Sequence, residues 1–161
     1  MQSMLPKGVS RSRLKRFLVA RPELKESIDW GPANAPMPFD TASELFSRLE
    51  RRLQSVPTHR HTAFAGPFEI DVTSTSPWHV AFAMNLFREK LPRGLAPKRG
   101  GLRTLRILHD PFGTVSALGM KIPVDTAIVL DPVELRIAII GTAYAGEIKK
   151  SAFTLCNYVL P

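Results

Sequence analysis

The chain has 161 residues, 44% of them apolar, and carries 22 basic against 14 acidic side chains, a net charge of +8. This length and apolar content predict one domain with its own core. No apolar stretch is long enough for a transmembrane helix, so we expect no membrane among the partners. The single Cys156 excludes an internal disulfide and any metal site built from several cysteines, and we expect it to be buried as a small apolar side chain.

The first half of the chain predicts short strands around one clear helix. Residues 17–20 are typical of a strand, and the Pro-, Gly- and Asn-rich residues 29–38 indicate a loop. From Phe39 to Val56 apolar residues recur at helical spacing, and Thr41 and Glu44 fit a capping box at the helix start. Aromatic and β-branched residues predict two further strands, over residues 61–64 and 68–73.

In the second half, strands dominate up to a closing helix. Pro77 suits the first turn of a helix that we expect to continue from Trp78 to Glu89. Proline, glycine and basic residues predict an exposed loop over residues 92–101. The strands expected here cover residues 102–109, 126–130 and 135–140, and the closing helix covers residues 146–160. Helices and strands alternate without a strict repeat, which predicts a mixed α/β domain.

The most informative segment joins the last expected strand to the closing helix. A turn of small residues from Gly141 to Gly146 delivers Tyr144 and two adjacent lysines, Lys149 and Lys150, to a strand–helix junction. Adjacent lysines repel each other, and the N-terminus of a helix favours anions. The arrangement therefore suits a phosphate, a carboxylate or a metal-bound anion. A solvated helix face would also account for the lysines, and Tyr144 could instead be an amphipathic core residue.

The remaining chemistry of the sequence is mostly structural. The four histidines are scattered and form no metal-ligand pattern, and we expect His79, beside Trp78, to be a structural hydrogen-bonding residue. No GxxxxGK[ST] loop occurs, so phosphoryl transfer would lack its phosphate cradle in this chain. The basic residues accompany no aromatic RNA-binding motif, zinc finger or helix-turn-helix, which disfavours nucleic acid as a partner.

Three segments resemble ATP-dependent phosphoenolpyruvate carboxykinase, in the order of that family. Residues 141–161, GTAYAGEIKKSAFTLCNYVLP, closely match its G-T-x-Y-x-G-E-[MI]-K-K-x-x-F-[ST]-x-x-N-Y-x-[LM]-P segment. Thr73 followed by residues 78–87 resembles its T-E-x-A-W-H-x-L-F-x-x-N-[LM]-F element. Arg11, Ser12 and residues 16–19 lie where the family has T-G-R-S-P-K-D-K-F-x-V, although residues 9–10 and 13–15 differ from that pattern.

The resemblance implies a two-domain enzyme with its active site between the domains, which converts oxaloacetate and ATP to phosphoenolpyruvate, ADP and carbon dioxide. Residues 1–161 would form a single, incomplete, amino-terminal substrate-binding domain, a mixed sheet flanked by helices. The partner would be the carboxyl-terminal nucleotide-binding domain, which is absent here. The cofactors implied are ATP and Mn²⁺ or Mg²⁺. Separately from the resemblance, residues 1–12 lack the continuous apolar core of a signal peptide, so we expect a cytoplasmic location.

The resemblance also implies roles for single residues. Lys150 resembles the family's lysine that ligates the metal ion and contacts the substrate. Lys149 resembles the neighbouring lysine, which faces the transferred phosphoryl group. These two lysines would be the catalytic and cofactor-binding residues. Tyr144 resembles the tyrosine that lines the substrate and carbon dioxide site, and Arg11 the arginine that grips the substrate carboxylate. A lysine ligates a metal only when neutral, so its pKa would have to fall from about 10.4.

The leading hypothesis is therefore part of an ATP-dependent phosphoenolpyruvate carboxykinase that is inactive on its own. Two alternatives stay open. One is a standalone non-catalytic module that binds an anion or a partner, and the other is a basic nucleic-acid binder.

Overall fold

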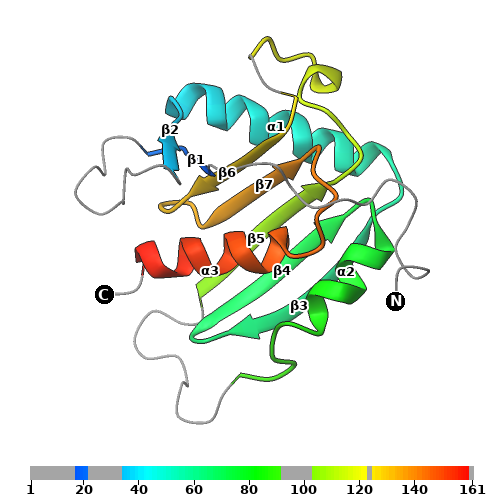
Figure 1. Cartoon of the computed structure of the whole chain (residues 1–161), viewed down its shortest axis with the longest axis vertical. Coiled ribbons are helices and arrows are strands. Elements are labelled where there is room, and N and C mark those ends of the chain that lie inside the picture. The colour runs from blue at the N-terminus through cyan, green and yellow to red at the C-terminus, as the bar shows by residue number, and fades with distance from the viewer. Residues whose placement is uncertain (1–16, 22–33, 92–102, 123–124, 160–161) are drawn as a thin grey trace.

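A computed structural model describes residues 17–21, 34–91, 103–122 and 125–159, which form a seven-stranded mixed sheet flanked by helices (Figure 1). The strands are β1 (Phe17–Val19), β2 (Asn34–Pro36), β3 (His59–Ala65), β4 (Phe68–Ser74), β5 (Arg103–Asp110), β6 (Ala127–Asp131) and β7 (Arg136–Ile140). Their order across the sheet is β2-β1-β6-β7-β5-β4-β3. Strands β1, β2 and β6 are parallel to one another, and so are β4, β5 and β7. The predicted mixed α/β fold is confirmed.

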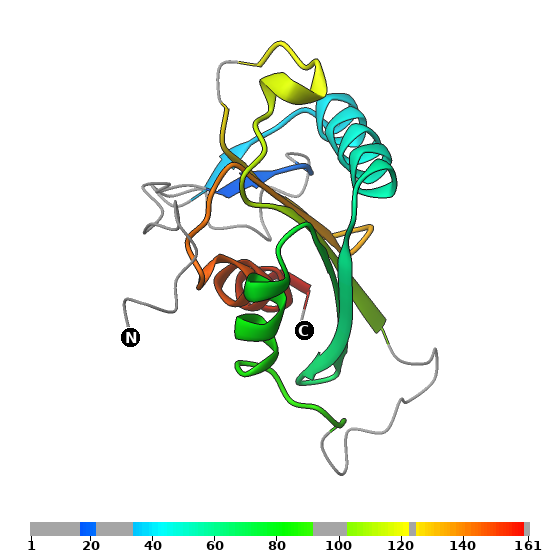
Figure 2. The ribbon, with the colours of Figure 1, turned by 90° about the vertical axis from the view of Figure 1, so that its right-hand side faces the viewer.

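Helices cover both faces of this sheet (Figure 2). Helix α1 (Phe39–Ser55) lies on one face, and α2 (Pro77–Met84) and α3 (Glu147–Val159) lie on the other. Because successive side chains of a strand point to opposite faces, β7 supplies both cores: Ala138 and Ile140 pack with α1, whereas Ile137 and Ile139 pack with the α2–α3 layer. Cys156 belongs to the second core and is buried, as predicted.

Most predicted elements are present, with differences at their ends. The helix expected up to Glu89 ends at Met84. The N–H of Asn85 and that of Leu86 each bond the carbonyl three residues back, which tightens the last turn. Arg88 then exchanges two backbone hydrogen bonds with Phe64 of β3, of 2.8 and 2.9 Å, so this segment pairs with the sheet edge instead of continuing the helix.

The start of α1 corrects one prediction. The helix begins at Phe39 with Pro38 at the N-cap and makes no side-chain capping hydrogen bond, so the predicted capping box of Thr41 and Glu44 is wrong. The carboxylate of Glu44 instead accepts a hydrogen bond of 2.9 Å from Nε of Arg48, one turn on. The loop expected over residues 29–38 contains the short strand β2, which pairs in parallel with β1 at the sheet edge, where proline is tolerated.

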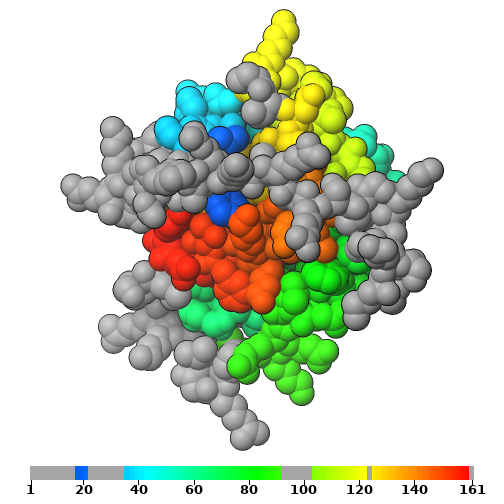
Figure 3. Space-filling view, in the orientation of Figure 1, coloured from blue at the N-terminus to red at the C-terminus, as the bar shows by residue number. Residues whose placement is uncertain are grey.

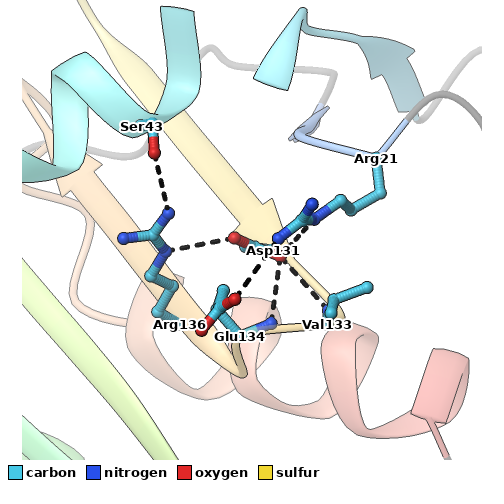
Figure 4. A network of polar contacts seen from close by, with 6 residues as sticks. All are labelled: Arg21, Ser43, Asp131, Val133, Glu134 and Arg136. Atoms are coloured by element: carbon cyan, nitrogen blue, oxygen red, sulfur yellow. Dashed lines mark hydrogen bonds and ion pairs between the residues drawn. The ribbon is translucent and has the colours of Figure 1, made fainter. Parts of the chain in front are cut away.

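A buried carboxylate fixes the turn between β6 and β7 (Figure 4). Asp131 is fully buried and accepts hydrogen bonds of 3.1 Å from Nε of Arg21 and from Nε of Arg136. Two backbone N–H groups of the turn donate to the same carboxylate. Arg136 also reaches Ser43 on α1, so the network joins the segment that follows β1, the β6–β7 turn and α1. No helix in the described part of the chain is long and apolar enough to cross a bilayer.

Candidate functional site at the carboxyl ends of β4, β5 and β7

Three parallel strands end at one edge of the sheet. In their register Ser74 lies opposite His109, and Asp110 lies opposite Ile140. The loop that follows β7 passes next to the start of α2 before α3 begins (Figure 1). Ligands of open α/β sheets bind at such carboxyl ends of parallel strands. This edge is therefore the candidate site.

Gly141 sets the direction in which the chain leaves β7. Its φ is +78°, and a Cβ there would lie 2.8 Å from the carbonyl oxygen of Asp125, so a side chain would be both strained and obstructed. The N–H of Gly141 donates to the carbonyl of Asp110 at 3.1 Å, and the hydroxyl of Thr126 donates to the carbonyl of Gly141 at 3.2 Å. The glycine is thus held by the last residue of β5 and by the residue before β6.

Tyr144 lies against the start of α3. Its N–H donates to the hydroxyl of Thr142 at 3.4 Å, and its carbonyl accepts from the N–H of Glu147, the first residue of α3, at 3.2 Å. Its ring folds back over Gly146, where an added Cβ would lie 3.2 Å from ring atoms that include the hydroxyl. Tyr144 is half-buried. Its position is compatible with either a site wall or the amphipathic core residue considered above.

The two lysines follow on the first turn of α3, whose outer side reaches the molecular surface (Figure 3). Lys149 is half-buried with its Nζ 5.6 Å from the centre of the Phe153 ring, whereas Lys150 is exposed with its Nζ 5.4 Å from that of Phe17 on β1. Both contacts are of the cation–π type. The structure therefore brings Tyr144 and both lysines onto one segment but places the two ammonium groups over different rings. The predicted Arg11 lies outside the described residues.

The metal-binding role that the resemblance implies for Lys150 would need further ligands besides its single nitrogen. Within the described ranges, no three His, Cys, Asp or Glu side chains gather closely enough to hold a metal ion. Lys150 would supply one nitrogen, whereas a divalent ion takes four or more ligands. The described part of the chain does not form a complete metal site.

Two hollows in the described surface lie away from this junction. One beside α1 is lined by Arg48, Arg51 and Arg52, and another between α1 and the sheet is lined by Arg60 and Arg106 among others. Neither contains Tyr144 or the two lysines.

A cluster of buried polar side chains lies next to the loop after β7: Ser74, Ser76, His79 and His109. Of these, the sequence indicated a structural role for His79 alone. Ring nitrogens of His79 lie 2.6 Å from the Ser76 hydroxyl and 2.9 Å from the Ala143 carbonyl, which confirms the structural hydrogen-bonding role expected for this histidine. Nδ1 of His109 lies 2.7 Å from the Ser74 hydroxyl. Burial lowers the pKa of both imidazoles, that of His109 to about 3. Both rings are therefore neutral at neutral pH.

The fold and the site define a mixed α/β protein with a cationic loop–helix junction at the carboxyl ends of its parallel strands. A model of the phosphoenolpyruvate carboxykinase family, of the ATP-dependent type, matches residues 5–161. The chain belongs to this family, as the resemblance predicted.

Individual relatives agree with the family match. The phosphoenolpyruvate carboxykinase (ATP) of Thermus thermophilus is 30% identical over 94% of this chain, that of Shouchella clausii 34% over 94%, and that of Bacillus subtilis 32% over 94%. The chain spans about 30% of the length of these relatives.

Proposed function

We propose that this chain is the substrate-binding part of an enzyme that converts oxaloacetate and ATP to phosphoenolpyruvate, ADP and carbon dioxide. The observation that carries the proposal is the family match over residues 5–161, which includes the junction of Tyr144, Lys149 and Lys150 at the carboxyl ends of parallel strands. Since the chain spans about 30% of its relatives, the ATP site and the other metal ligands would come from a part outside it. The chain alone should be inactive.

The proposed roles follow from charge. Loss of carbon dioxide from oxaloacetate leaves an enolate, whose negative charge is stabilised by fixed cations and by helix N-terminal N–H groups. Lys149 and Lys150 stand on the first turn of α3, where both effects act together. Each ammonium group sits on a flexible stem, and in this proposal both turn from their aromatic contacts towards one anion. Tyr144 would line the site and Arg11 would hold a carboxylate. ATP and Mn²⁺ or Mg²⁺ are the cofactors proposed.

The lysine site can be tested with oxalate, a stable two-carboxylate probe, titrated calorimetrically into the 161-residue chain with Mg²⁺ present. We expect binding that Lys150→Ala weakens about tenfold or more, because an ion pair and a metal ligand are lost together. The control is Lys90→Ala, since Lys90 is also exposed but lies beyond α2. Equal affinity of the two variants would rule out Lys150 as a ligand-binding residue.

The same titration addresses the alternatives. A chain that binds oxalate, but supports no turnover when joined to the rest of a relative, would be the non-catalytic anion-binding module. Salt-sensitive retention on nucleic acid with no response to oxalate would favour the nucleic-acid binder, which the net charge of +8 leaves open.

A further inference from the structure

We infer that His79 is a positioning residue for the loop that carries Tyr144, and that the hydroxyl of Ser76 selects the tautomer in which it does so. The inference rests on the proposed function only where it connects the loop to substrate binding. Its structural part stands on the contacts between α2 and the loop after β7.

The hydrogen bonds of His79 specify one tautomer. The carbonyl oxygen of Ala143 can only accept, so Nε2, at 2.9 Å, must carry the hydrogen. In a neutral ring Nδ1 is then an acceptor, and the Ser76 hydroxyl at 2.6 Å donates to it. The same hydroxyl oxygen accepts from the backbone N–H of His79 at 3.4 Å as the N-cap of α2. Ser76 thus links the start of the helix to the protonation pattern of the ring.

The surroundings keep the ring neutral and fixed. His79 is fully buried, and its aromatic neighbours are the uncharged rings of Trp78, His109 and Phe112, at centroid distances of 4.9, 5.1 and 5.9 Å. Burial lowers the pKa of His79, because an imidazolium here would lose its hydration. The ring therefore donates one hydrogen bond in one direction.

That hydrogen bond ends at the residue before Tyr144. Ala143 is buried. Among the hydrogen bonds that residues 143–146 make within the described part of the chain, the one from His79 connects them to α2, whereas the others stay within the loop and α3. Fixing the Ala143 carbonyl fixes the Ala143–Tyr144 peptide plane, and hence the positions of the N and Cα atoms from which the Tyr144 side chain projects. His79 acts through the backbone and need not touch substrate.

The positioning can be read with ¹⁹F NMR of the whole chain labelled with 3-fluorotyrosine. The sequence contains two tyrosines, Tyr144 and Tyr158, so the second resonance is an internal control. We expect His79→Leu to shift or broaden the Tyr144 resonance and leave that of Tyr158 in place. His79→Gln retains an amide donor and should return the Tyr144 resonance towards its wild-type position. An unmoved Tyr144 resonance in folded His79→Leu, or no recovery in His79→Gln, would overturn the inference.

A second variant keeps the test decisive if His79→Leu does not fold. Ser76→Ala leaves the imidazole in place but frees Nδ1, so the other tautomer becomes accessible and the bond to Ala143 weakens. The Tyr144 resonance should then move in the same direction by a smaller amount. No movement would refute the role of Ser76.

Oxalate with Mg²⁺ then separates this inference from the proposed function. We expect the Tyr144 resonance of the wild-type chain to respond to oxalate, with affinity about tenfold weaker in His79→Leu and recovered in His79→Gln. If the wild type ignores oxalate while His79→Leu still moves Tyr144, the positioning holds and the proposed function fails. If oxalate binds equally to wild type and His79→Leu, the connection from His79 to the site is wrong.

Discussion

At the residue scale, the buried imidazoles couple folding to pH. Burial, with the neighbouring His79 adding to it, lowers the pKa of His109 to about 3, whereas a histidine in the unfolded chain titrates near 6.5. Below about pH 6.5 the unfolded state binds a proton that the folded state excludes, so the free energy of unfolding falls as the pH falls. His79 contributes in the same direction, since burial also lowers its pKa.

We therefore predict that His109 alone makes the free energy of unfolding drop by about 1 kcal/mol between about pH 7 and about pH 5.5. His109→Gln removes the buried imidazole, so the free energy of unfolding of this variant should drop less between the two pH values, as measured by urea unfolding at both. His61→Gln is the control, because His61 is exposed and its ring stays in water in both states. An unchanged pH dependence in His109→Gln would show that His109 is not neutral and buried as described.

At the element scale, the Asp131 network joins the segment that follows β1, the β6–β7 turn and α1. We predict that Asp131→Ala lowers the free energy of unfolding by about 3–5 kcal/mol, because two arginines lose a fully buried partner. The control is Glu50→Ala, which removes the carboxylate of an exposed ion pair: the side chains of Glu50 and Arg106 are 46% and 50% exposed. This variant should lower the free energy of unfolding by less than about 1 kcal/mol. Equal losses in the two variants, measured by urea unfolding, would contradict the structural role given to the network.

Elements with a strong local pattern were predictable, and those made by pairing were not. The helical spacing of Leu45, Phe46 and Leu49 predicts α1, because burial against the sheet follows that spacing. Strand β2 has no such signal, since Asn34–Pro36 becomes a strand only through its pairing with β1. Likewise, Tyr144 and the lysines were predictable because they are contiguous, whereas His79 and Ala143 are 64 residues apart and meet only in the fold.

At the scale of the whole molecule, one mixed sheet carries the candidate site at the carboxyl ends of three parallel strands, in a chain that spans about 30% of its relatives. Three points stay predictions: the single substrate-binding domain, the cytoplasmic location, and the roles of Arg11, Tyr144, Lys149 and Lys150. If they hold, this chain would supply the substrate side of the proposed reaction, and the nucleotide side would lie elsewhere.

The most direct test is ATP-dependent formation of phosphoenolpyruvate from oxaloacetate by a chimera in which this chain replaces the matching part of the Thermus thermophilus relative. We predict an active chimera, a loss of about 100-fold or more with Lys150→Ala, little change with Lys90→Ala, and no product from the isolated chain. Phosphoenolpyruvate made by the isolated chain, or a folded chimera that is inactive or indifferent to Lys150→Ala, would contradict the account.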